Sequence, residues 1–161
     1  MKASHTVFGI DPGLARCGWA VLTSGSQPQL VAAGCLVTPA GQPDGKRLLT
    51  IHQRLLKLLR QYQPRVVAIE KLYLTKNVST AMSVGQARGV ALLAAAEAAL
   101  PVLEFAPTTV KQAVTGDGRA DKRQIASMVM RLLKLTRTPR YDDTLDALAV
   151  ALCGGQSRML Q

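Results

Sequence analysis

Two carboxylates in this chain stand directly after short apolar runs that are typical of buried β-strands. Asp11 follows the run 7–10 (VFGI), and Glu70 follows the run 66–69 (VVAI). In α/β proteins, functional sites form at the edge of the sheet where strands end and present their last side chains together. If these two strands are neighbours, we expect Asp11 and Glu70 to face each other. The plainer alternatives are an ordinary turn residue at the first position and a strand-end surface acid at the second.

A second pair of acids lies near the C-terminus in the motif Asp143-Thr-Leu-Asp146. Side chains three residues apart share one face of a helix, so both carboxylates point the same way from its first turn. The positive end of the helix dipole also favours acids at that place. Asp146 lies within an otherwise apolar segment (LDALAVALC), which is unusual for a solvated acid. The alternative for Asp142 or Asp143 is an N-cap, and we expect one of the two to have that role.

Four carboxylates brought together would repel one another and raise each other's pKa unless a cation lay between them. No cluster of His and Cys accompanies these acids in the sequence, and an all-oxygen site suits Mg²⁺ or Mn²⁺ rather than Zn²⁺. Two such ions can activate a water molecule and stabilise the leaving oxygen when a phosphodiester is cleaved. The pattern therefore favours a metal-dependent nuclease.

The charge balance supports a polyanionic partner. The 161 residues include 20 Lys and Arg against 10 Asp and Glu, which gives a net charge of +10 and a pI near 10.1. Such an excess points first to nucleic acid and second to an anionic membrane. Residues 17–43 carry no charge, but Gly, Ser, Gln and Pro interrupt them, and elsewhere apolar runs such as the eight residues 89–96 are short. A spanning helix needs ~20 apolar residues, so no membrane association is expected.

Composition also bounds the class of protein. Hydrophobic residues make up 48% of the chain, which is enough for a buried core and excludes a disordered chain. Cys17, Cys35 and Cys153 are odd in number and widely spaced in apolar surroundings, so we expect reduced core thiols. The N-terminus lacks the apolar region of a signal peptide. These features predict a cytoplasmic protein.

The elements that must position the acids follow from apolar periodicity and turn residues. We expect five strands, over His5–Asp11, Cys17–Thr23, Leu30–Thr38, Arg65–Glu70 and Pro101–Phe105. Helices are expected from Asp44 to Pro64, over Ser79–Leu100, over Thr108–Val114, from Asp121 to about Leu135, and from Asp142 or Asp143 to a stop at Gly154-Gly155. This order predicts one α/β domain over residues 1–161, in which helices cover both faces of a mixed sheet.

Three helices carry further detail. The first is amphipathic, and its charged residues, Arg47 among them, are expected on the solvent-facing side. The helix over 79–100 is apolar nearly all round and is expected to be buried or packed on a partner, with Gly85 and Gly89 on one face where close approach is possible. The motif Asp121-x-x-Gln124 resembles a capping box that opens the fourth helix.

An ordered set of motifs resembles the RuvC family of bacterial Holliday junction resolvases. The motifs are Phe8-Gly-Ile-Asp-Pro-Gly13, Gly18-Trp19, Ala68-Ile-Glu-Lys71, Lys76-Asn77, Gly85-Gln-Ala-Arg-Gly-Val90, Val110-Lys-Gln112 and Asp143-x-x-Asp-Ala-Leu-Ala149. The first motif alone is moderately specific, whereas the whole set at these spacings is highly specific. The similarity covers about Val7 to Cys153, and the chain departs from the family in the loop Leu14-Ala-Arg-Cys17.

The resemblance implies an RNase H-like fold with a five-stranded mixed sheet, a homodimer, and paired symmetric nicks in a four-way DNA junction during recombination and repair. It implies Mg²⁺ or Mn²⁺, two ions in each site, held by Asp11, Glu70, Asp143 and Asp146. Spacing within the motif selects Asp143 over Asp142. The branch-migration proteins RuvA and RuvB are the further partners that the resemblance implies.

The resemblance also implies a DNA-contacting set. Tyr73 takes the place of an aromatic residue that contacts bases at the opened junction centre. Lys111 and Lys122 match basic residues that bind the phosphate backbone or stabilise charge in the transition state. Lys111 is also expected to be a catalytic residue, together with the four acids. The residues expected to contact DNA are Tyr73, Lys76, Asn77, Arg88, Lys111, Lys122 and Arg123.

Three other functions are weighed against junction cleavage. A nuclease of the same fold could act on RNA or an RNA–DNA hybrid. A non-catalytic, structure-specific DNA-binding module would explain the basic charge but not four acids beside DNA. A sugar-kinase or actin-like ATPase also has a G-x-D-x-G loop after a strand, but it closes two such domains on its nucleotide, and 161 residues hold only one.

Overall fold

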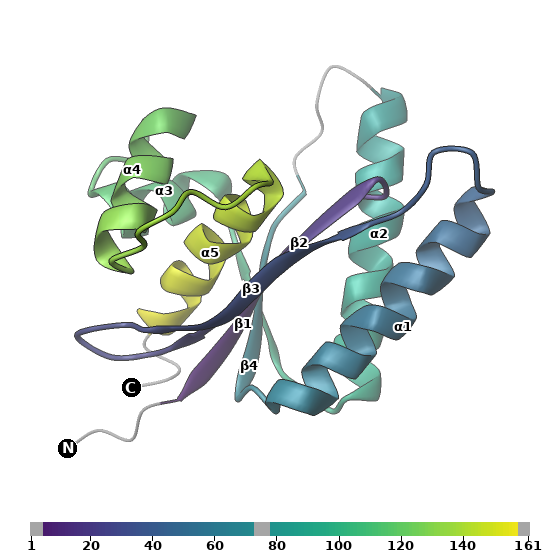
Figure 1. The fold of residues 1–161 in the computed structure, drawn as a ribbon, viewed down its shortest axis with the longest axis horizontal. Helices are drawn as coiled ribbons and strands as arrows, with labels where there is room; N and C mark the ends of the chain where they lie inside the picture. The colour runs from purple at the N-terminus through teal and green to yellow at the C-terminus, as the bar shows by residue number, and fades with distance from the viewer. Residues whose placement is uncertain (1–4, 73–77, 158–161) are drawn as a thin grey trace.

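The computed structural model describes residues 5–72 and 78–157. At its centre is a five-stranded sheet in the order β3-β2-β1-β4-β5 (Figure 1). The strands are β1 (Thr6–Asp11), β2 (Arg16–Thr23), β3 (Leu30–Val37), β4 (Val66–Glu70) and β5 (Val102–Phe105). β1, β2 and β3 form an antiparallel meander, whereas β4 lies parallel to β1 and β5 lies parallel to β4. The prediction of a mixed five-stranded sheet is confirmed.

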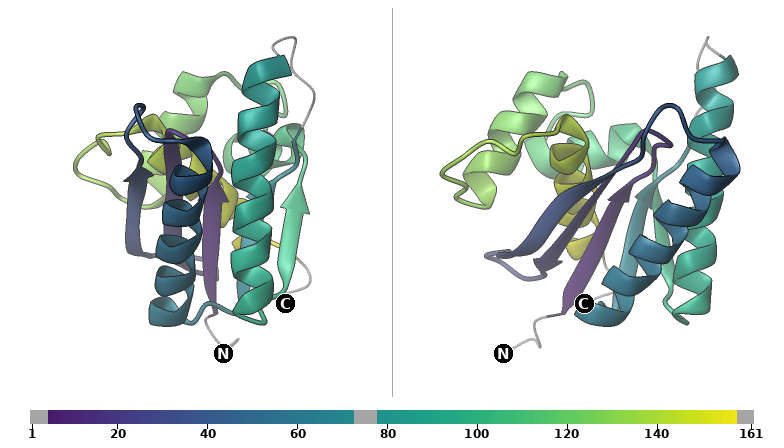
Figure 2. Two further views of the ribbon diagram at one scale, coloured as in Figure 1. Left: turned by 90° about the vertical axis from the view of Figure 1, so that its right-hand side faces the viewer. Right: turned by 45° about the vertical axis from the view of Figure 1, so that its right-hand side comes forward.

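Helices cover both faces of this sheet. α1 (Asp44–Tyr62) and α2 (Val78–Glu97) lie side by side on one face (Figure 1, Figure 2). α5 (Asp142–Gly155) lies against the other face, with α3 (Pro107–Thr115) and α4 (Lys122–Leu132) packed outside it. α2 provides the crossover that the parallel pair β4–β5 requires.

Period-two alternation in the central strands divides the core between the two faces. In β1, Val7 packs in the α5 layer, and Phe8 packs in the layer of α1 and α2. In β4, Val66 and Ala68 likewise belong to the α5 layer. Both strands are buried on both faces, which explains why their apolar runs are uninterrupted. The same alternation decides which way the last side chain of each strand points.

α5 lies very close to the sheet because glycines face it. A Cβ on Gly18 would lie 1.8 Å from the carbonyl oxygen of Asp143, and one on Gly9 would lie 2.3 Å from another α5 carbonyl. A Cβ on Gly154, within α5, would lie 2.8 Å from a β4 side chain. The prediction that the last helix stops at Gly154-Gly155 is confirmed, because α5 ends at Gly155. Gly154 also permits the close packing of α5 on the sheet.

Arg47 in α1 is also not where the periodicity places it. Its residue is only 9% exposed, and its Nε donates a hydrogen bond of 2.9 Å to Thr38 Oγ1. Thr38 Oγ1 in turn donates to the Leu14 carbonyl oxygen at 2.6 Å, and Arg47 Nη1 lies 3.4 Å from Asp44 Oδ1. A guanidinium can be buried only with such partners. Thr38 lies in the loop after β3, and Asp44 is the first residue of α1. Helical periodicity takes no account of the contact with the loop.

The predicted capping box is present at the start of α4. The Asp121 carboxylate accepts from the Gln124 backbone N–H, and the Gln124 side chain accepts from the Asp121 backbone N–H, both at 2.8 Å. α4 ends at Leu132, short of the predicted Leu135, and Lys134 has a φ of 51°. α2 also ends early, at Glu97, and is followed by Ala99 with a φ of 55°. In both cases a left-handed residue interrupts the helix inside the apolar pattern.

Within residues 5–72 and 78–157, no helix is both long enough and apolar enough to cross a membrane. All three cysteines are free thiols; Cys17 and Cys153 are buried, and Cys35 is half-buried. This agrees with the prediction of reduced core thiols.

Candidate active site and metal centre

Asp11 and Glu70 end neighbouring strands and point to the same face of the sheet. β1 and β4 are parallel, and Ile10 pairs with Ile69. Asp11 and Glu70 each follow one of these paired residues, so they lie next to each other at the end of the two strands. Because the side chains two and four positions earlier face α5, the alternation turns both carboxylates toward α5. Both acids line a cavity of about 250 Å³ at the end of these strands.

α5 brings the other acids to the same edge of the sheet. Asp146, one turn inside the helix, lines this cavity with Asp11 and Glu70. Asp143 lies beside them, with its backbone carbonyl against Gly18, the β2 partner of Asp11. A side chain on Gly18 would push the start of α5 away from Asp11. The lack of one therefore allows acids from the sheet and the helix to meet.

Burial separates Asp142 from its neighbour. The Asp142 side chain is 72% exposed and pairs with Lys122, whereas the Asp143 side chain is only 21% exposed. The N-cap of α5 is Tyr141, which makes no side-chain capping bond. The expectation that Asp142 or Asp143 caps the helix is therefore wrong: both lie within the first turn, where the helix dipole favours them but no hydrogen bond of the capping type forms.

The crowding of acids changes their pKa values. Burial, followed by the negative charges of Asp146, Asp143 and Glu70, raises the pKa of Asp11 from 3.8 to about 8, although Lys122 opposes the shift. Burial and the charge of Asp146 raise the pKa of Glu70. Burial also raises the pKa of Asp146, against the effect of Lys122. Upward shifts of neighbouring acids mark negative charge that the protein alone does not compensate.

Two lysines face these acids. Lys111 of α3 and Lys122 of α4 line the same cavity of about 250 Å³. Lys122 Nζ lies 3.6 Å from Asp146 Oδ2 and 3.4 Å from Asp142 Oδ2. Slight burial lowers the pKa of Lys122, but the two acids outweigh it and the net change is upward. Lys122 therefore stays positively charged in the cavity.

The donor set suits a hard divalent cation, because every candidate ligand atom is a carboxylate oxygen. Asp143 Oδ2 is buried and accepts no hydrogen bond from a described residue, since the Arg16 Nε that lies 3.2 Å away does not have hydrogen-bond geometry. A bound water molecule or a cation satisfies such an oxygen. Among the described residues, no three Asp, Glu, His or Cys side chains are already gathered at ligand spacing. Asp11, Glu70 and Asp146 nevertheless line one cavity, and their carboxylate oxygens are the kind of ligand that a divalent cation prefers.

Arg88 lies in an adjoining cavity, also of about 250 Å³, which Asp11 and Glu70 line as well. Its guanidinium forms an ion pair with Glu104 of β5. Three further residues expected to contact DNA, Tyr73, Lys76 and Asn77, lie outside the described residues.

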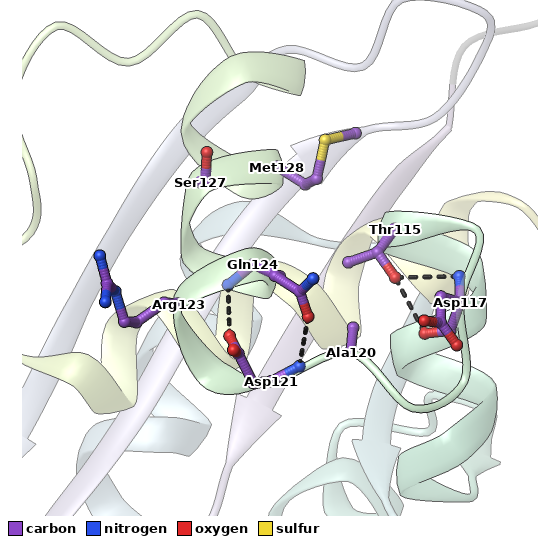
Figure 3. A pocket seen from close by; sticks show the side chains of 8 residues that line it. All are labelled: Thr115, Asp117, Ala120, Asp121, Arg123, Gln124, Ser127 and Met128. Atoms are coloured by element: carbon purple, nitrogen blue, oxygen red, sulfur yellow. Dashed lines mark hydrogen bonds between the residues drawn. The ribbon is translucent and has the colours of Figure 1, made fainter.

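Arg123 lies elsewhere, at a cavity of about 500 Å³ between the α3–α4 loop and α4 (Figure 3). The two carboxylates of this cavity are already in use, since Asp121 closes the capping box and Asp117 accepts a hydrogen bond of 2.8 Å from the Arg119 backbone. Arg123 extends away from these hydrogen bonds. The described residues that line this cavity include none of the four candidate ligands, so the structure separates Arg123 from the acidic cavity.

Sequence reasoning missed two arginines beside the acids. Arg16, the first residue of β2, pairs with Asp143, and its Cζ lies 5.9 Å from the ring centre of Tyr141. Arg47 lines the same cavity as Arg16 and Asp143. The available signal for Arg16 was a basic residue in the short loop after the first acid. Arg47 had none, because its helical position predicts exposure.

Comparison with known proteins places the chain in a family. A family model described as crossover junction endodeoxyribonuclease RuvC matches residues 7–154. The chain belongs to the RuvC family. A RuvC from Chloroflexus aggregans is 53% identical over 147 residues, which cover 91% of this chain and 90% of that protein. A RuvC from Roseiflexus sp. is 50% identical over 155 residues, with coverages of 95% and 91%.

Solved structures extend this relation to three dimensions. Thermus thermophilus RuvC in complex with a Holliday junction substrate is 37% identical, with a TM-score of 0.89 and coverage of 96% of both chains. The yeast mitochondrial Holliday junction resolvase Ydc2, at 13% identity and a TM-score of 0.63, shares the fold alone. The RNase H-like fold that the motifs implied is thus the fold of this RuvC-family chain.

Proposed function

We propose that this chain, as a single nuclease domain over residues 1–161, resolves four-way DNA junctions by paired symmetric nicks during recombination and repair. The observation that carries the proposal is the meeting of Asp11, Glu70 and Asp146, with Asp143 beside them, in a cavity also lined by two lysines. Membership of the RuvC family supports an endodeoxyribonuclease of the crossover-junction type. The junction bound to the Thermus relative supports the substrate.

The carboxylates have the role of holding divalent cations, two in each site, with Mg²⁺ or Mn²⁺ as the ions. A bound divalent cation supplies charge neutralisation and Lewis-acid activation of water for attack on the phosphorus. Asp11 and Glu70 stand at the ends of buried strands, and Asp143 and Asp146 stand on the first turns of a packed helix. Their backbone positions are therefore set before DNA binds, which lowers the cost of reaching the transition state.

The lysines act on the phosphate. Lys111 and Lys122 bind its non-bridging oxygens and stabilise the negative charge that grows as the bond to the leaving oxygen breaks. Lys122 is already paired with acids, so in the complex it shares its charge between Asp146 and the phosphate. Lys111 lines the same cavity from α3 and acts directly on the phosphate.

Other basic residues hold the DNA backbone in this proposal. Arg88 reaches DNA by exchanging Glu104 for a phosphate, and Arg123 contacts an arm of the junction away from the cut. Tyr73, Lys76 and Asn77 contact the junction centre by the family resemblance.

The proposal includes a homodimer, since paired nicks need two sites. The outer surface of α2 supports it: Met82 is 62% exposed and Leu93 is 52% exposed, and a Cβ on Gly89 between them would meet nothing within 4 Å. Sedimentation of the 17.2 kDa chain should give twice its mass, and Leu93→Glu should return it to one chain. A monomer at micromolar concentration would count against paired nicking.

RuvA and RuvB are the proposed branch-migration partners, and the cytoplasm is the proposed compartment, both by the family resemblance. A pull-down of the tagged chain with purified RuvA and RuvB on a four-way junction tests the proposed partners.

Strand cleavage of a synthetic mobile four-way junction tests the function. We expect paired symmetric nicks that require divalent metal and are lost in Glu70→Gln, while that variant still binds the junction. Linear duplex and an RNA–DNA hybrid are the controls. Cleavage of the hybrid alone would keep the carboxylate chemistry and reject the junction as substrate. Binding without product at any Mg²⁺ or Mn²⁺ concentration would reduce the chain to a DNA-binding module.

A further inference from the structure

Three cavities adjoin at the end of the central strands. The cavity with Lys111 and Lys122 shares Asp11 and Glu70 with a second cavity, and this second cavity shares Thr80 and Val84 with a third of about 360 Å³. Among the described residues, the first and third share no lining residue. Asp11 and Glu70 therefore lie between the two lysines and the third cavity, and we call the three adjoining cavities the depression.

The third cavity is lined by groups that bind anions. Arg16 and Arg47 contribute guanidinium groups, and Ser79, Thr80 and Ser83 of α2 also line the cavity, with the Ser83 hydroxyl donating to the Ser79 carbonyl oxygen at 3.2 Å. We call these five residues the arginine subsite. A guanidinium can bind two phosphate oxygens at once, which an ammonium group does not do, and Arg16 is the arginine of the subsite that is exposed enough to do so.

The two arginines differ in how they are held. Arg47 is fixed, because it is buried and hydrogen-bonded through Nε to Thr38 and paired through Nη1 with Asp44. Arg16 is half-exposed, and its contact with Asp143 involves Nε. One arginine thus forms a rigid wall of the cavity, and the other stands where a ligand can reach it. The acid that lines the cavity, Asp143, is one of the proposed metal ligands, so a bound cation compensates its charge.

The start of α2 adds a second, independent preference for an anion. Most exposed helix starts gain from an acid in the first turn, yet α2 has none, and two of its hydroxyl residues stand there instead. Backbone N–H groups at a helix start bind phosphate when no acid competes. The α2 start and the two arginines face the same cavity.

We propose that the arginine subsite binds a backbone phosphate of the cleaved strand, adjacent to the phosphate held between the acids and the lysines. This inference rests on the proposed function, because it takes DNA as the ligand. A strand laid along the depression would place one phosphate at the acids and a neighbouring one at Arg16 and Arg47. The subsite then fixes the direction and register of the strand in the active site.

Salt-dependent junction binding tests the subsite. Fluorescence anisotropy of a labelled four-way junction is measured against KCl concentration, in the Glu70→Gln background with fixed Mg²⁺ so that no cleavage occurs. Arg16→Gln should lower affinity several-fold and reduce the slope of log K against log salt by about 0.7–0.9, the value for one lost phosphate contact. Arg16→Lys keeps the charge and should recover most of the slope.

The matched control is Arg60→Gln, which removes the same charge from an exposed position at the far end of α1, ~20 Å along the helix from Arg47. It should leave the slope unchanged. A second variant, Ser79→Asp, places an acid in the first turn of α2, where the dipole favours it. It should unfold no earlier than the parent and yet bind the junction more weakly.

Junctions with a single neutral methylphosphonate locate the phosphate. The effect of Arg16→Gln should vanish when one particular phosphate beside the scissile one is neutralised. Equal slopes for Arg16→Gln and Arg60→Gln, or an Arg16 effect that persists with every methylphosphonate, would overturn the subsite. Junction cleavage by the chain without these substitutions reports on the proposed function separately. If the junction is cleaved but Arg16→Gln has no effect on the slope, only the proposed arginine subsite is rejected. If Arg16→Gln changes the slope but the junction is not cleaved, only the proposed nuclease function is rejected.

Discussion

Replacement of Asp11 by Asn should stabilise the metal-free protein at neutral and alkaline pH. The substitution keeps the shape of the side chain and removes a charge that burial and three neighbouring acids disfavour, the causes that raise the pKa of Asp11 to about 8. Most substitutions of half-buried residues destabilise. An increase would therefore show that the site is strained by its own charge.

The sign and size follow from proton linkage. Below about pH 4, Asp11 is protonated in both the folded and the unfolded chain, so the two proteins should be equally stable. Between about pH 4 and pH 8 the folded protein keeps a proton that the unfolded chain releases, so wild-type stability falls as pH rises, and above about pH 8 the loss is complete. The rise in the pKa of Asp11 from 3.8 to about 8 sets an upper limit of about 6 kcal/mol on the stability that Asp11→Asn gains over the wild type. Because the cavity is open to water, which screens the charges, we expect about 2 kcal/mol.

Thermal unfolding with EDTA, at several pH values from about 4 to about 9, measures this difference. About 2 kcal/mol corresponds to a rise of about 4–8 °C in Tm for a chain of this size. The control is Asp142→Asn, which removes the same charge from an exposed side chain and should not stabilise. Added Mg²⁺ should raise the Tm of the wild type more than that of Asp11→Asn. A wild type at least as stable as Asp11→Asn near pH 9, or a difference that does not change with pH, would refute the reasoning.

Three further predictions concern the reaction, the packing of α5 and the capping box of α4. Lys111→Ala should lower kcat for junction cleavage by about 10²–10³-fold with a much smaller change in junction affinity, as measured by single-turnover kinetics and anisotropy; an unchanged kcat would remove Lys111 from the reaction. Gly18→Ala should cost about 1–3 kcal/mol in urea unfolding, because its Cβ would lie 1.8 Å from the Asp143 carbonyl oxygen. Gly45→Ala in α1, where a Cβ would meet none of the described residues within 4 Å, should stabilise by about 0.4–1 kcal/mol. Equal effects at the two glycines would contradict the close approach of α5. Asp121→Ala should cost about 1 kcal/mol through loss of the α4 capping box, and no change would show that the cap is dispensable.

The arrangement of strands and helices could be predicted from local patterns. Uninterrupted apolar runs indicated β1 and β4 as central strands, because strands buried on both faces need no polar alternation. The same pattern does not identify the edge strand β3, which is equally apolar and partly exposed. The ends of those runs then located Asp11 and Glu70, and the i, i+3 spacing located Asp143 and Asp146 on one helix. Each of these inferences concerns a residue and its own element. Element ends were less predictable, since residues such as Ala99 and Lys134 turn left-handed inside an apolar pattern.

Contacts between elements were decided only by the tertiary structure. Arg47 has the sequence position of a solvated residue, yet Thr38, from the loop before its helix, buries it. Arg16 meets Asp143 because glycines in β1 and β2 let α5 lie directly on the sheet, and nothing in the local sequence of either residue encodes that approach. The acids could be recognised in the sequence because they end apolar runs or lie within an apolar helix, where a charged residue is unusual. The arginines beside them were not, because a basic side chain on a surface helix or loop has the same local pattern whether it meets solvent or a cavity.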